Sequence, residues 1–559
     1  MHCLFCPAFS SRLAGCLSAL LMLPTAQASD PATQHLRDQQ HSLQRQEQDQ
    51  RLKRWQSRPA PQGPASTPEA PGDSRQWAVS GLRIVGNQQI SDPALERALR
   101  GLVRPRMGIG DINELLKAIT ALYVREGFPT TRPYLVQPPK DDAPLDIVIV
   151  EGFVESIEFA DTTLPLSLKG AFPATVGRPL HLPALEQGLD QLNRLRAYDL
   201  SLDLLPGDLQ GGTRVVLQSQ QLGSRWHLDS RLDNRGSELT GRHRFYVGLG
   251  VDSPLGVNDD LRVSLISTAL DAPGRSQGLT LYYSIPYGPW TFALNASQLT
   301  YQAPLPHSRS TSDGTTQYQG ASIERVLWRN QQGLLSASAR LDRKQLINRS
   351  AGAVIIQQSP TLTSFEAGIN LLWLQDGLWN TYLGAAQGMN WFGADRSPLG
   401  AERLRPDFRK YRFNLLHLRQ GPVDRPWRWQ SELALQHSEH ALPAVEQLLV
   451  SDDSTVRGFR LRTYSGASGG AWRNTFSQPL PAPWFQPLQV RPYAGLDVGW
   501  VKSATGKPSQ HLAGAAVGVE LTLPSVRLRL DYQRPLHASD LPRSHLESGY
   551  WVMECSLHI

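Results

Sequence analysis

From residue 221 to its last residue the chain alternates apolar and polar side chains in one segment after another, and this pattern restricts the possible folds more than any other feature. In residues 526–533, VRLRLDYQ, the apolar side chains fall on one side of an extended chain, and Arg527, Arg529 and Asp531 fall on the other. A side-chain period of two predicts β-strands. At roughly 20 residues per strand and connection, a length of about 335 residues predicts about 16 strands, more than an ordinary β-sandwich contains. We therefore expect a transmembrane antiparallel β-barrel, with a soluble β-rich protein as the alternative.

The end of the chain and its aromatic residues favour the membrane barrel. The last apolar row ends with the chain and comprises Trp551, Met553, Cys555, Leu557 and Ile559. A chain that ends inside a strand must pair that strand, and closure of a barrel does so. Twelve of the 14 tryptophans follow residue 221, which is typical of the aromatic girdles at the two ends of lipid-facing strands.

The first 28 residues predict export from the cytoplasm. Arg12 precedes an apolar stretch, and residues 26–28, Ala-Gln-Ala, form a small-x-small cleavage site, so residues 1–28 are expected to be a signal peptide. Residues 13–16 also fit a lipoprotein processing box, but they open the apolar stretch instead of following it. Removal of this peptide leaves Cys555 as the only cysteine, so packing or a closed sheet must hold the mature chain together without disulfides.

Two polar segments follow the cleavage site. Residues 34–56 are rich in Gln and Arg and have few aliphatic side chains, so a helix here would lack an apolar face. Such a helix either stays solvated or sits in a wet cavity, and a disordered segment is the alternative. Five prolines between Pro59 and Pro71 then predict an extended linker.

The next part of the chain predicts two small α+β modules. Residues 77–150 read β-α-α-β-β, with Asp111 as the expected N-cap of the second helix. The same order recurs in residues 154–220, where the second helix is expected over residues 182–195. Two tandem copies of one architecture are the simplest interpretation.

Motifs for catalysis, metals or nucleic acids are weak. Residues 466–470 fit G-x-S-x-G, but a glycine-rich loop leading into a strand lacks the helix that a nucleophile elbow needs. His437, Glu439 and His440 match no metal-binding spacing. Lys and Arg are scattered, and the formal net charge is only +6. We therefore expect no enzyme activity, no catalytic residue, no cofactor, no metal and no nucleic-acid partner.

One loop motif has a matching strand elsewhere in the chain. Residues 456–459, Val456-Arg457-Gly458-Phe459, form its core, and residues 495–499, Gly495-Leu496-Asp497-Val498-Gly499, form a strand in which Asp497 shares a face with two glycines. Those glycines leave room for another segment to approach the wall. If the loop folded inward, Arg457 could hold Asp497 with two hydrogen bonds, Gly458 could supply a sharp turn and Phe459 could pack on the wall. An exposed arginine in an outer turn is the alternative.

The mature chain resembles the outer-membrane transporters of two-partner secretion, the ShlB/FhaC/HecB family of haemolysin secretion and activation proteins. The most specific segments are residues 112–138, 172–195, 232–244, 454–459 and 493–499. The resemblance implies a barrel of about 16 strands, two periplasmic POTRA domains and a helix that plugs the pore. It also implies that Arg457 of a loop folded into the lumen contacts Asp497. The expected segments are a signal peptide (1–28), a plug helix (29–58), a linker (59–75), POTRA 1 (76–152), POTRA 2 (153–222) and a barrel (223–559) with its lumen loop around 445–475.

The resemblance also implies a function. The chain would lie in the outer membrane of a Gram-negative bacterium and export one large, extended exoprotein, an adhesin, cytolysin or contact-dependent toxin, without nucleotide hydrolysis. The POTRA surfaces would receive the substrate, outer-membrane lipid and lipopolysaccharide would surround the barrel, and the barrel-assembly machinery would insert it. An insertase of the same superfamily is the alternative, and a passive porin or adhesin, which the two periplasmic modules disfavour, is the third. Ser451-Asp452-Asp453 departs from the glycine-rich approach usual in the family, so the two acids either compete with Asp497 for Arg457 or face water.

Overall fold

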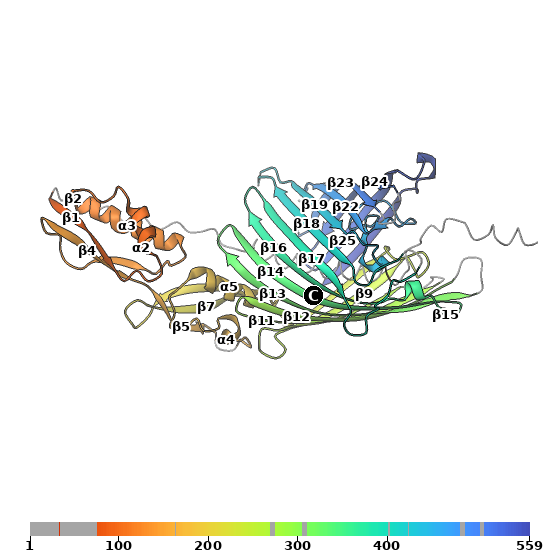
Figure 1. Ribbon diagram of the computed structural model, residues 1–559, viewed down its shortest axis with the longest axis horizontal. Coiled ribbons are helices and arrows are strands. Elements are labelled where there is room, and N and C mark those ends of the chain that lie inside the picture. The colour runs from red at the N-terminus through yellow and green to blue at the C-terminus, as the bar shows by residue number, and fades with distance from the viewer. Residues whose placement is uncertain are drawn as a thin grey trace, which may run out of the picture.

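The computed structural model describes Thr33 and residues 75–161, 164–268, 274–304, 310–400, 403–422, 424–480, 487–502 and 508–559. Apart from Thr33 and Arg75, the predicted signal peptide, plug helix and linker lie outside these residues. The described chain forms two small α+β domains followed by a barrel (Figure 1).

The first α+β domain has a four-stranded sheet of order β2-β1-β4-β3 covered by two helices. Its elements are β1 (Gln76–Val85), α2 (Asp92–Leu99), β2 (Arg106–Gly108), α3 (Ile109–Arg125), β3 (Arg132–Leu135) and β4 (Ala143–Val150). Helical spacing places Leu115 and Ile119 of α3 on one face, where both are fully buried in one core with Ile147 of β4. The three-residue strand β2 was not predicted, because it is too short to show an alternating pattern.

The start of α3 differs from the prediction. The helix begins at Ile109 with Gly108 as its N-cap, so Asp111 is the third helical residue and not the cap. Its carboxylate accepts a hydrogen bond from the backbone N–H of Gly108 at 2.9 Å. The acid therefore reaches back to the cap residue, as the third residue of a capping box does.

The second α+β domain has a three-stranded sheet of order β5-β7-β6. Its elements are β5 (Phe153–Phe159), α4 (Leu168–Ala171), α5 (Leu182–Asn193), β6 (Tyr198–Pro206) and β7 (Gly212–Leu222). Leu185 and Leu192 of α5 are fully buried against Leu217 of β7 in one core. The two predicted α+β modules are thus both present.

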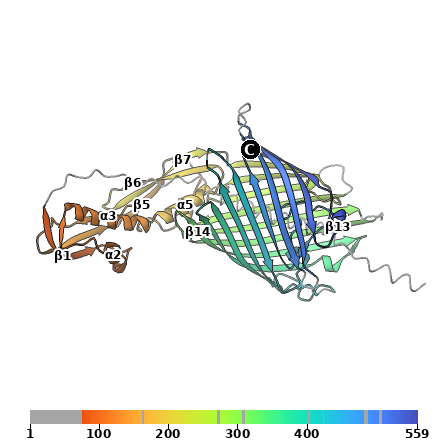
Figure 2. The ribbon, with the colours of Figure 1, turned by 90° about the horizontal axis from the view of Figure 1, so that it is seen from above.

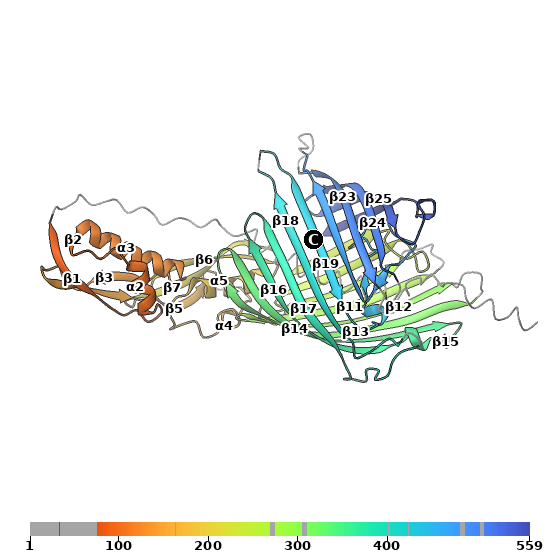
Figure 3. The same cartoon turned by 45° about the horizontal axis from the view of Figure 1, so that its top comes forward.

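The rest of the described chain forms a closed antiparallel barrel of sixteen strands, together with the two-residue β15 (Ala353–Val354) (Figure 2, Figure 3). The strands are β8 (Trp226–Asp233), β9 (Arg244–Asp252), β10 (Asp260–Thr268), β11 (Arg275–Tyr287), β12 (Trp290–Pro304), β13 (Thr311–Arg329), β14 (Gly333–Ser350), β16 (Thr361–Leu374), β17 (Leu378–Met389), β18 (Arg409–Gln420), β19 (Arg428–His437), β22 (Ser468–Ser477), β23 (Gln489–Lys502), β24 (Gln510–Thr522), β25 (Val526–Ala538) and β26 (Tyr550–His558). The last strand pairs with the first and closes the ring. The predicted barrel of about 16 strands after two α+β domains is confirmed, whereas the predicted plug helix lies outside the described residues.

The alternation in the sequence separates the two faces of the barrel wall. On β25, Leu528 and Leu530 are 40% and 39% exposed, whereas Asp531 and Gln533 of the same strand are fully buried. Trp551 of β26 is also exposed. Because strand side chains alternate between faces, the exposed apolar row lies outside and the charged row lines the lumen.

Helices in the described part of the chain are all too short or too polar to cross a membrane.

Polar side chains fasten the second α+β domain to one end of the barrel. In α5, Gln191 donates a hydrogen bond to the carbonyl oxygen of Gly288 at 3.0 Å. Just after α5, Arg194 donates to the carbonyl oxygen of Asn258 at 2.7 Å. Gly288 and Asn258 lie in turns between barrel strands, so these contacts orient the domain at this end of the barrel.

Candidate functional site

A long loop between β19 and β22, residues 438–467, is the candidate site, and we call it the lumen loop. It contains the short helix η2 (Ala444–Glu446) and a stem of two strands, β20 (Leu448–Leu449) and β21 (Ser465–Gly466). The predicted range, around residues 445–475, starts and ends several residues after the observed loop. Residues from Ser468 onward pair with β23 and belong to the barrel wall.

The tip of the lumen loop places Arg457 against Asp497 of β23. The Nε atom of Arg457 lies 2.6 Å from Oδ2 of Asp497, and its Nη2 atom lies 2.7 Å from Oδ1. The backbone N–H of Arg457 also donates to Oδ2, at 3.1 Å. Both side chains are 0% exposed. The carboxylate therefore accepts three hydrogen bonds from one loop residue, in the bidentate geometry that only arginine can supply.

Glycines on the wall make this approach possible. A Cβ atom on Gly495 would lie 2.0 Å from Nη2 of Arg457, and one on Gly499 would lie 2.3 Å from Cγ1 of Val450. Gly514 of β24, which no motif in the sequence indicates, is equally constrained, because its Cβ would lie 1.8 Å from the carbonyl oxygen of Arg457. Because these glycines have no side chains, the loop can lie directly against the backbone of the wall.

The other residues of the tip seat the loop by turn geometry and packing. Gly458 has φ +101°, which favours glycine, and a Cβ there would meet the backbone of Arg534 at 2.4 Å. Val456 is fully buried and Phe459 is 5% exposed. The ring of Phe459 packs edge-on against Tyr464 with centroids 5.7 Å apart. The tetrad is therefore an inward tip and not an exposed turn.

Gln533 of β25 joins the tip to the wall and was not predicted. Its Oε1 atom accepts hydrogen bonds from the backbone N–H of Gly458 at 3.2 Å and from the hydroxyl of Tyr550 at 3.3 Å. Its Nε2 atom donates to Asp531 at 2.8 Å and to Asp453 of the loop. The only sequence signal was its place on the charged face of residues 526–533.

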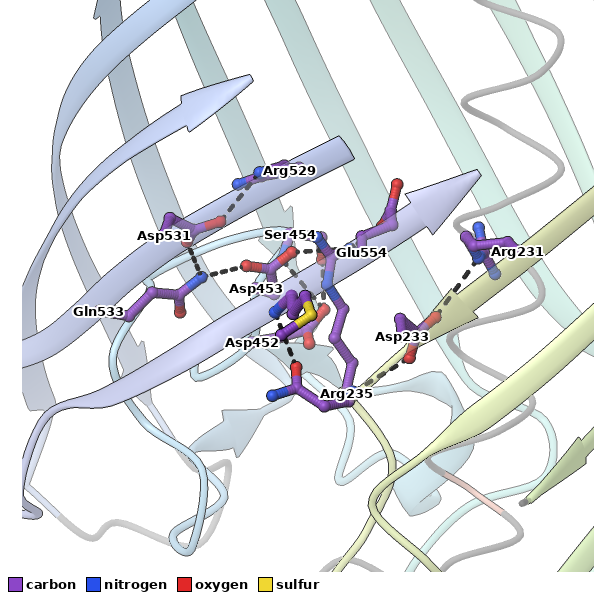
Figure 4. Close-up of polar contacts among 12 residues, drawn as sticks. Arg231, Asp233, Arg235, Asp452, Asp453, Ser454, Arg529, Asp531, Gln533 and Glu554 are labelled. Atoms are coloured by element: carbon purple, nitrogen blue, oxygen red, sulfur yellow. Dashed lines mark hydrogen bonds and ion pairs between the residues drawn. The ribbon is translucent and has the colours of Figure 1, made fainter. Parts of the chain in front are cut away.

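The two acids before the tip have partners other than Arg457. Asp453 forms an ion pair with Arg235, the second residue after β8, at 3.1 Å (Figure 4). Asp452 accepts hydrogen bonds from the backbone N–H and the hydroxyl of Ser454. Asp453 thus ties the loop to the start of the barrel, whereas Asp452 acts within the loop.

A second buried ion cluster holds the lumen loop at η2. The carboxylate of Glu446 lies 2.7 Å from Nζ of Lys344 on β14 and 2.7 Å from Nζ of Lys410 on β18. The Glu446 side chain is 1% exposed. No local pattern in the sequence indicates this contact, because Lys344 precedes Glu446 by 102 residues. The loop, which connects β19 to β22, is therefore held by β14 and β18 on one side and by β23 on the other.

The other candidate motifs have ordinary structural roles. Ser468 of the G-x-S-x-G motif begins β22, and its hydroxyl donates to the carbonyl oxygen of Ser438 at 3.0 Å. The Nδ1 atom of His440 accepts a hydrogen bond from the backbone N–H of Arg409 at 2.9 Å. Within the described ranges, His, Cys, Asp and Glu side chains form no group of three or more suited to a metal ion.

A closed sixteen-stranded barrel, two α+β domains at one end and a loop pinned inside define the class of outer-membrane barrels with POTRA domains. Within that class, the chain belongs to the haemolysin secretion/activation protein family ShlB/FhaC/HecB, whose model matches residues 211–521. A ShlB-type POTRA domain model matches residues 77–152, and a second POTRA model matches residues 153–206. The protein is therefore an outer-membrane protein with periplasmic POTRA domains.

Individual relatives agree with this assignment. The chain is 32% identical to Hemolysin transporter protein ShlB of Serratia marcescens over 496 residues, which cover 88% of this chain and 86% of the relative. It is 30% identical to Outer membrane transporter CdiB of Escherichia coli over 551 residues, covering 94% and 90%. The solved structure of CdiB from Escherichia coli superposes with a TM-score of 0.85 at 26% identity, covering 95% of this chain and 99% of that one. These relatives are named as transporters.

Proposed function

We propose that this protein is the pore through which one large exoprotein crosses the outer membrane in extended form, and that the lumen loop closes this pore at rest. The buried pair of Arg457 and Asp497 carries the proposal, because it fastens a loop across the path that a passing chain would take. The family relatives, named as hemolysin and CdiB transporters, support the substrate class. An adhesin, cytolysin or contact-dependent toxin would be such a substrate.

The barrel has the width that this role needs. Sixteen strands enclose an aqueous channel when nothing fills the lumen. Here the loop tip and η2 contact the inner faces of strands from β14 to β25. Export then requires the loop to leave its seat, and Arg457 with Asp497 is the contact that must break.

The POTRA domains offer strand edges for an extended substrate. Within the described residues, β2 and β3 are the edges of the first sheet, and β5 and β6 are the edges of the second. Tyr134 of β3 is 52% exposed. An extended chain can add to such an edge through backbone hydrogen bonds. The POTRA domains would then recognise the extended conformation of the substrate more than one short sequence motif. Transport of this kind needs no catalytic group, and folding of the substrate outside the cell would supply its direction.

The proposal also includes roles for the N-terminal segments and for the membrane partners. Residues 29–58 would plug the pore, residues 1–28 would direct export, and lipid, lipopolysaccharide and the barrel-assembly machinery would be the membrane partners. The insertase alternative has less support, since the family assignment is to transporters.

Deletion of this protein in a strain that carries its exoprotein tests the proposal. We expect the exoprotein to disappear from the cell surface and the culture medium, while other outer-membrane barrels keep their normal levels. Normal secretion with a collapse of other barrels would favour the insertase and overturn the proposal.

A further inference from the structure

The barrel closes at a short seam between β26 and β8. Five residue pairs are in register, from Glu554 opposite Asp233 to His558 opposite Asp229, and Leu228 and Ile559 exchange two further backbone hydrogen bonds. The neighbouring pairings, β25 with β26 and β8 with β9, each have eight. The first residues of β26 therefore extend beyond the end of β8 on the side away from the POTRA domains. Each missing pair removes backbone hydrogen bonds that stabilise a barrel wall.

A side chain replaces part of this missing pairing. The Nδ2 atom of Asn234, the residue after β8, donates to the carbonyl oxygen of Trp551 at 2.9 Å. Its Oδ1 atom accepts a hydrogen bond from the backbone N–H of Met553 at 2.9 Å. The amide group thus imitates one further residue of a strand, so the seam depends on the position of Asn234.

The lumen loop holds this position from inside the barrel. Nη1 of Arg235 lies 3.1 Å from Oδ2 of Asp453 in the loop and 3.1 Å from Oε2 of Glu554 in β26, and Figure 4 shows Arg235 reaching toward both carboxylates. Side chains of all three residues are less than one-fifth exposed. One arginine therefore links the loop, the end of the first strand and the last strand.

A second loop residue contacts the same place. Arg460 donates a hydrogen bond to the carbonyl oxygen of Asn234. Its guanidinium group also lies over the ring of Tyr550 in β26, 5.1 Å from the centroid. Arg460 thus touches both sides of the seam, independently of Asp453.

We propose that the lumen loop fastens the closing seam of the barrel. Asp453 and Arg460 hold residues 234–235 against β26, so withdrawal of the loop loosens the pairing of β8 with β26. The loop can shift this equilibrium because it makes these contacts only when it is seated. Fastening of the seam is a property of the barrel wall and does not depend on what the barrel carries.

Amide hydrogen exchange of the purified full-length protein in lipid tests the proposal. Asp453→Asn removes one of the two charges that Arg235 faces and leaves Glu554 in place. Asp452→Asn is the matched control, since the side chain of this neighbouring acid accepts its hydrogen bonds from Ser454 of the same loop. Hydrogen bonds to charged groups are strong enough that we expect roughly a tenfold faster exchange at the seam, in residues 550–559, for the first variant. The control should exchange like the parent, and strands β12 and β13, far from the seam, should be unchanged in both.

A covalent bridge across the seam shows whether the faster exchange comes from seam opening. Leu232 stands directly opposite Cys555, which is the only free cysteine in the described residues. Opposite residues have Cβ atoms about 4.5–5.5 Å apart, so a short thiol crosslinker can join Leu232→Cys to Cys555. In the crosslinked Asp453→Asn protein, exchange at the seam should return to the parental rate.

Arg460→Gln provides a second variant should Asp453→Asn fail to insert into membranes. It should also speed exchange at residues 550–559 and leave β12 and β13 unchanged. Seam exchange equal to that of the Asp452→Asn control would overturn the proposal, as would an equal acceleration in β12 and β13, which would indicate general destabilisation.

Discussion

Arg457 and Asp497, forty positions apart in the sequence, form a bidentate ion pair inside the barrel, and neither side chain is exposed. Charges without access to water are stable only while each remains paired. The pair therefore acts as a lock between the lumen loop and the wall, and the loop cannot leave until another group or water replaces the partner of Asp497.

Replacement of Arg457 by alanine should abolish or severely reduce secretion while the barrel remains inserted. The variant leaves the Asp497 carboxylate buried without its partner, at a cost of about 3–5 kcal/mol to the seated loop. Without the pair the loop has no defined seat to leave and return to, so the ordered change between the closed and the open pore that export requires would be lost. Secretion at matched membrane levels measures the effect, with Arg462→Ala, an exposed arginine of the same loop, as the control. Equal secretion by Arg457→Ala and the parent would contradict the lock.

Replacement of Glu446 by glutamine should make the resting pore leak. The change leaves Lys344 and Lys410 buried without their shared carboxylate, and we expect roughly a tenfold increase in open-channel events in planar bilayers. Glu439→Gln makes the same change at an exposed position of the same loop and should behave like the parent. Identical recordings for the two variants would show that η2 does not hold the loop.

Deletion of residues 30–58 should raise the conductance of the purified protein in planar bilayers. The expected plug is polar on all sides, and a polar helix is stable in a water-filled lumen. The parent and the deletion variant should be compared at the same number of inserted channels. An unchanged conductance would show that this segment is not a plug.

Acidification should loosen the contact between the two POTRA domains. His181 of the second domain packs against Phe128 of the first, with ring centroids 5.1 Å apart, and burial lowers the pKa of His181 below its ordinary value of about 6.5, while Glu186 opposes this shift. Because the docked state favours the neutral ring, its stability is complete above pH 6.5 and declines as the pH falls below that value.

Hydrogen exchange at residues 127–128 and 181–185, measured between pH 5 and 8 and corrected for intrinsic rates, reports this contact. Exchange should accelerate toward the acid end in the parent. In His181→Gln, which cannot take up a proton, the pH dependence should be absent. The same acid-dependent acceleration in the variant would exclude His181 as its cause.

The sequence predicts those parts of the fold that depend on local patterns. The alternation in residues 526–533 and 551–559 identifies lipid-facing rows, and helical spacing locates α5 to within two residues of its end. Asp497 could be connected with the loop because two glycines flank it on one face of a strand.

Contacts between distant segments could not be predicted in this way. In the sequence, Lys344 and Lys410 look like other strand residues, and only the closed barrel places them next to Glu446. Asp453 looked like a competitor for Arg457, but closure of the ring supplies Arg235, more than two hundred residues upstream, as its partner. These pairings depend on the register of the whole barrel, and a single sequence does not specify that register at the level of side chains.

A reversible covalent lock on the lumen loop tests whether the loop leaves the wall during export. Val450 of the lumen loop packs against the wall at Gly499, where an added Cβ would lie 2.3 Å from its Cγ1 atom. Val450→Cys removes a methyl group at this contact, so that its thiol can form a disulfide with Gly499→Cys. Secretion should be measured in a Cys555→Ser background, with and without reductant, beside each single-cysteine variant. Movement of the loop predicts that the oxidised double variant does not export its exoprotein and that reduction restores export. Equal export by the oxidised and reduced proteins would show instead that the exoprotein passes while the loop stays on the wall.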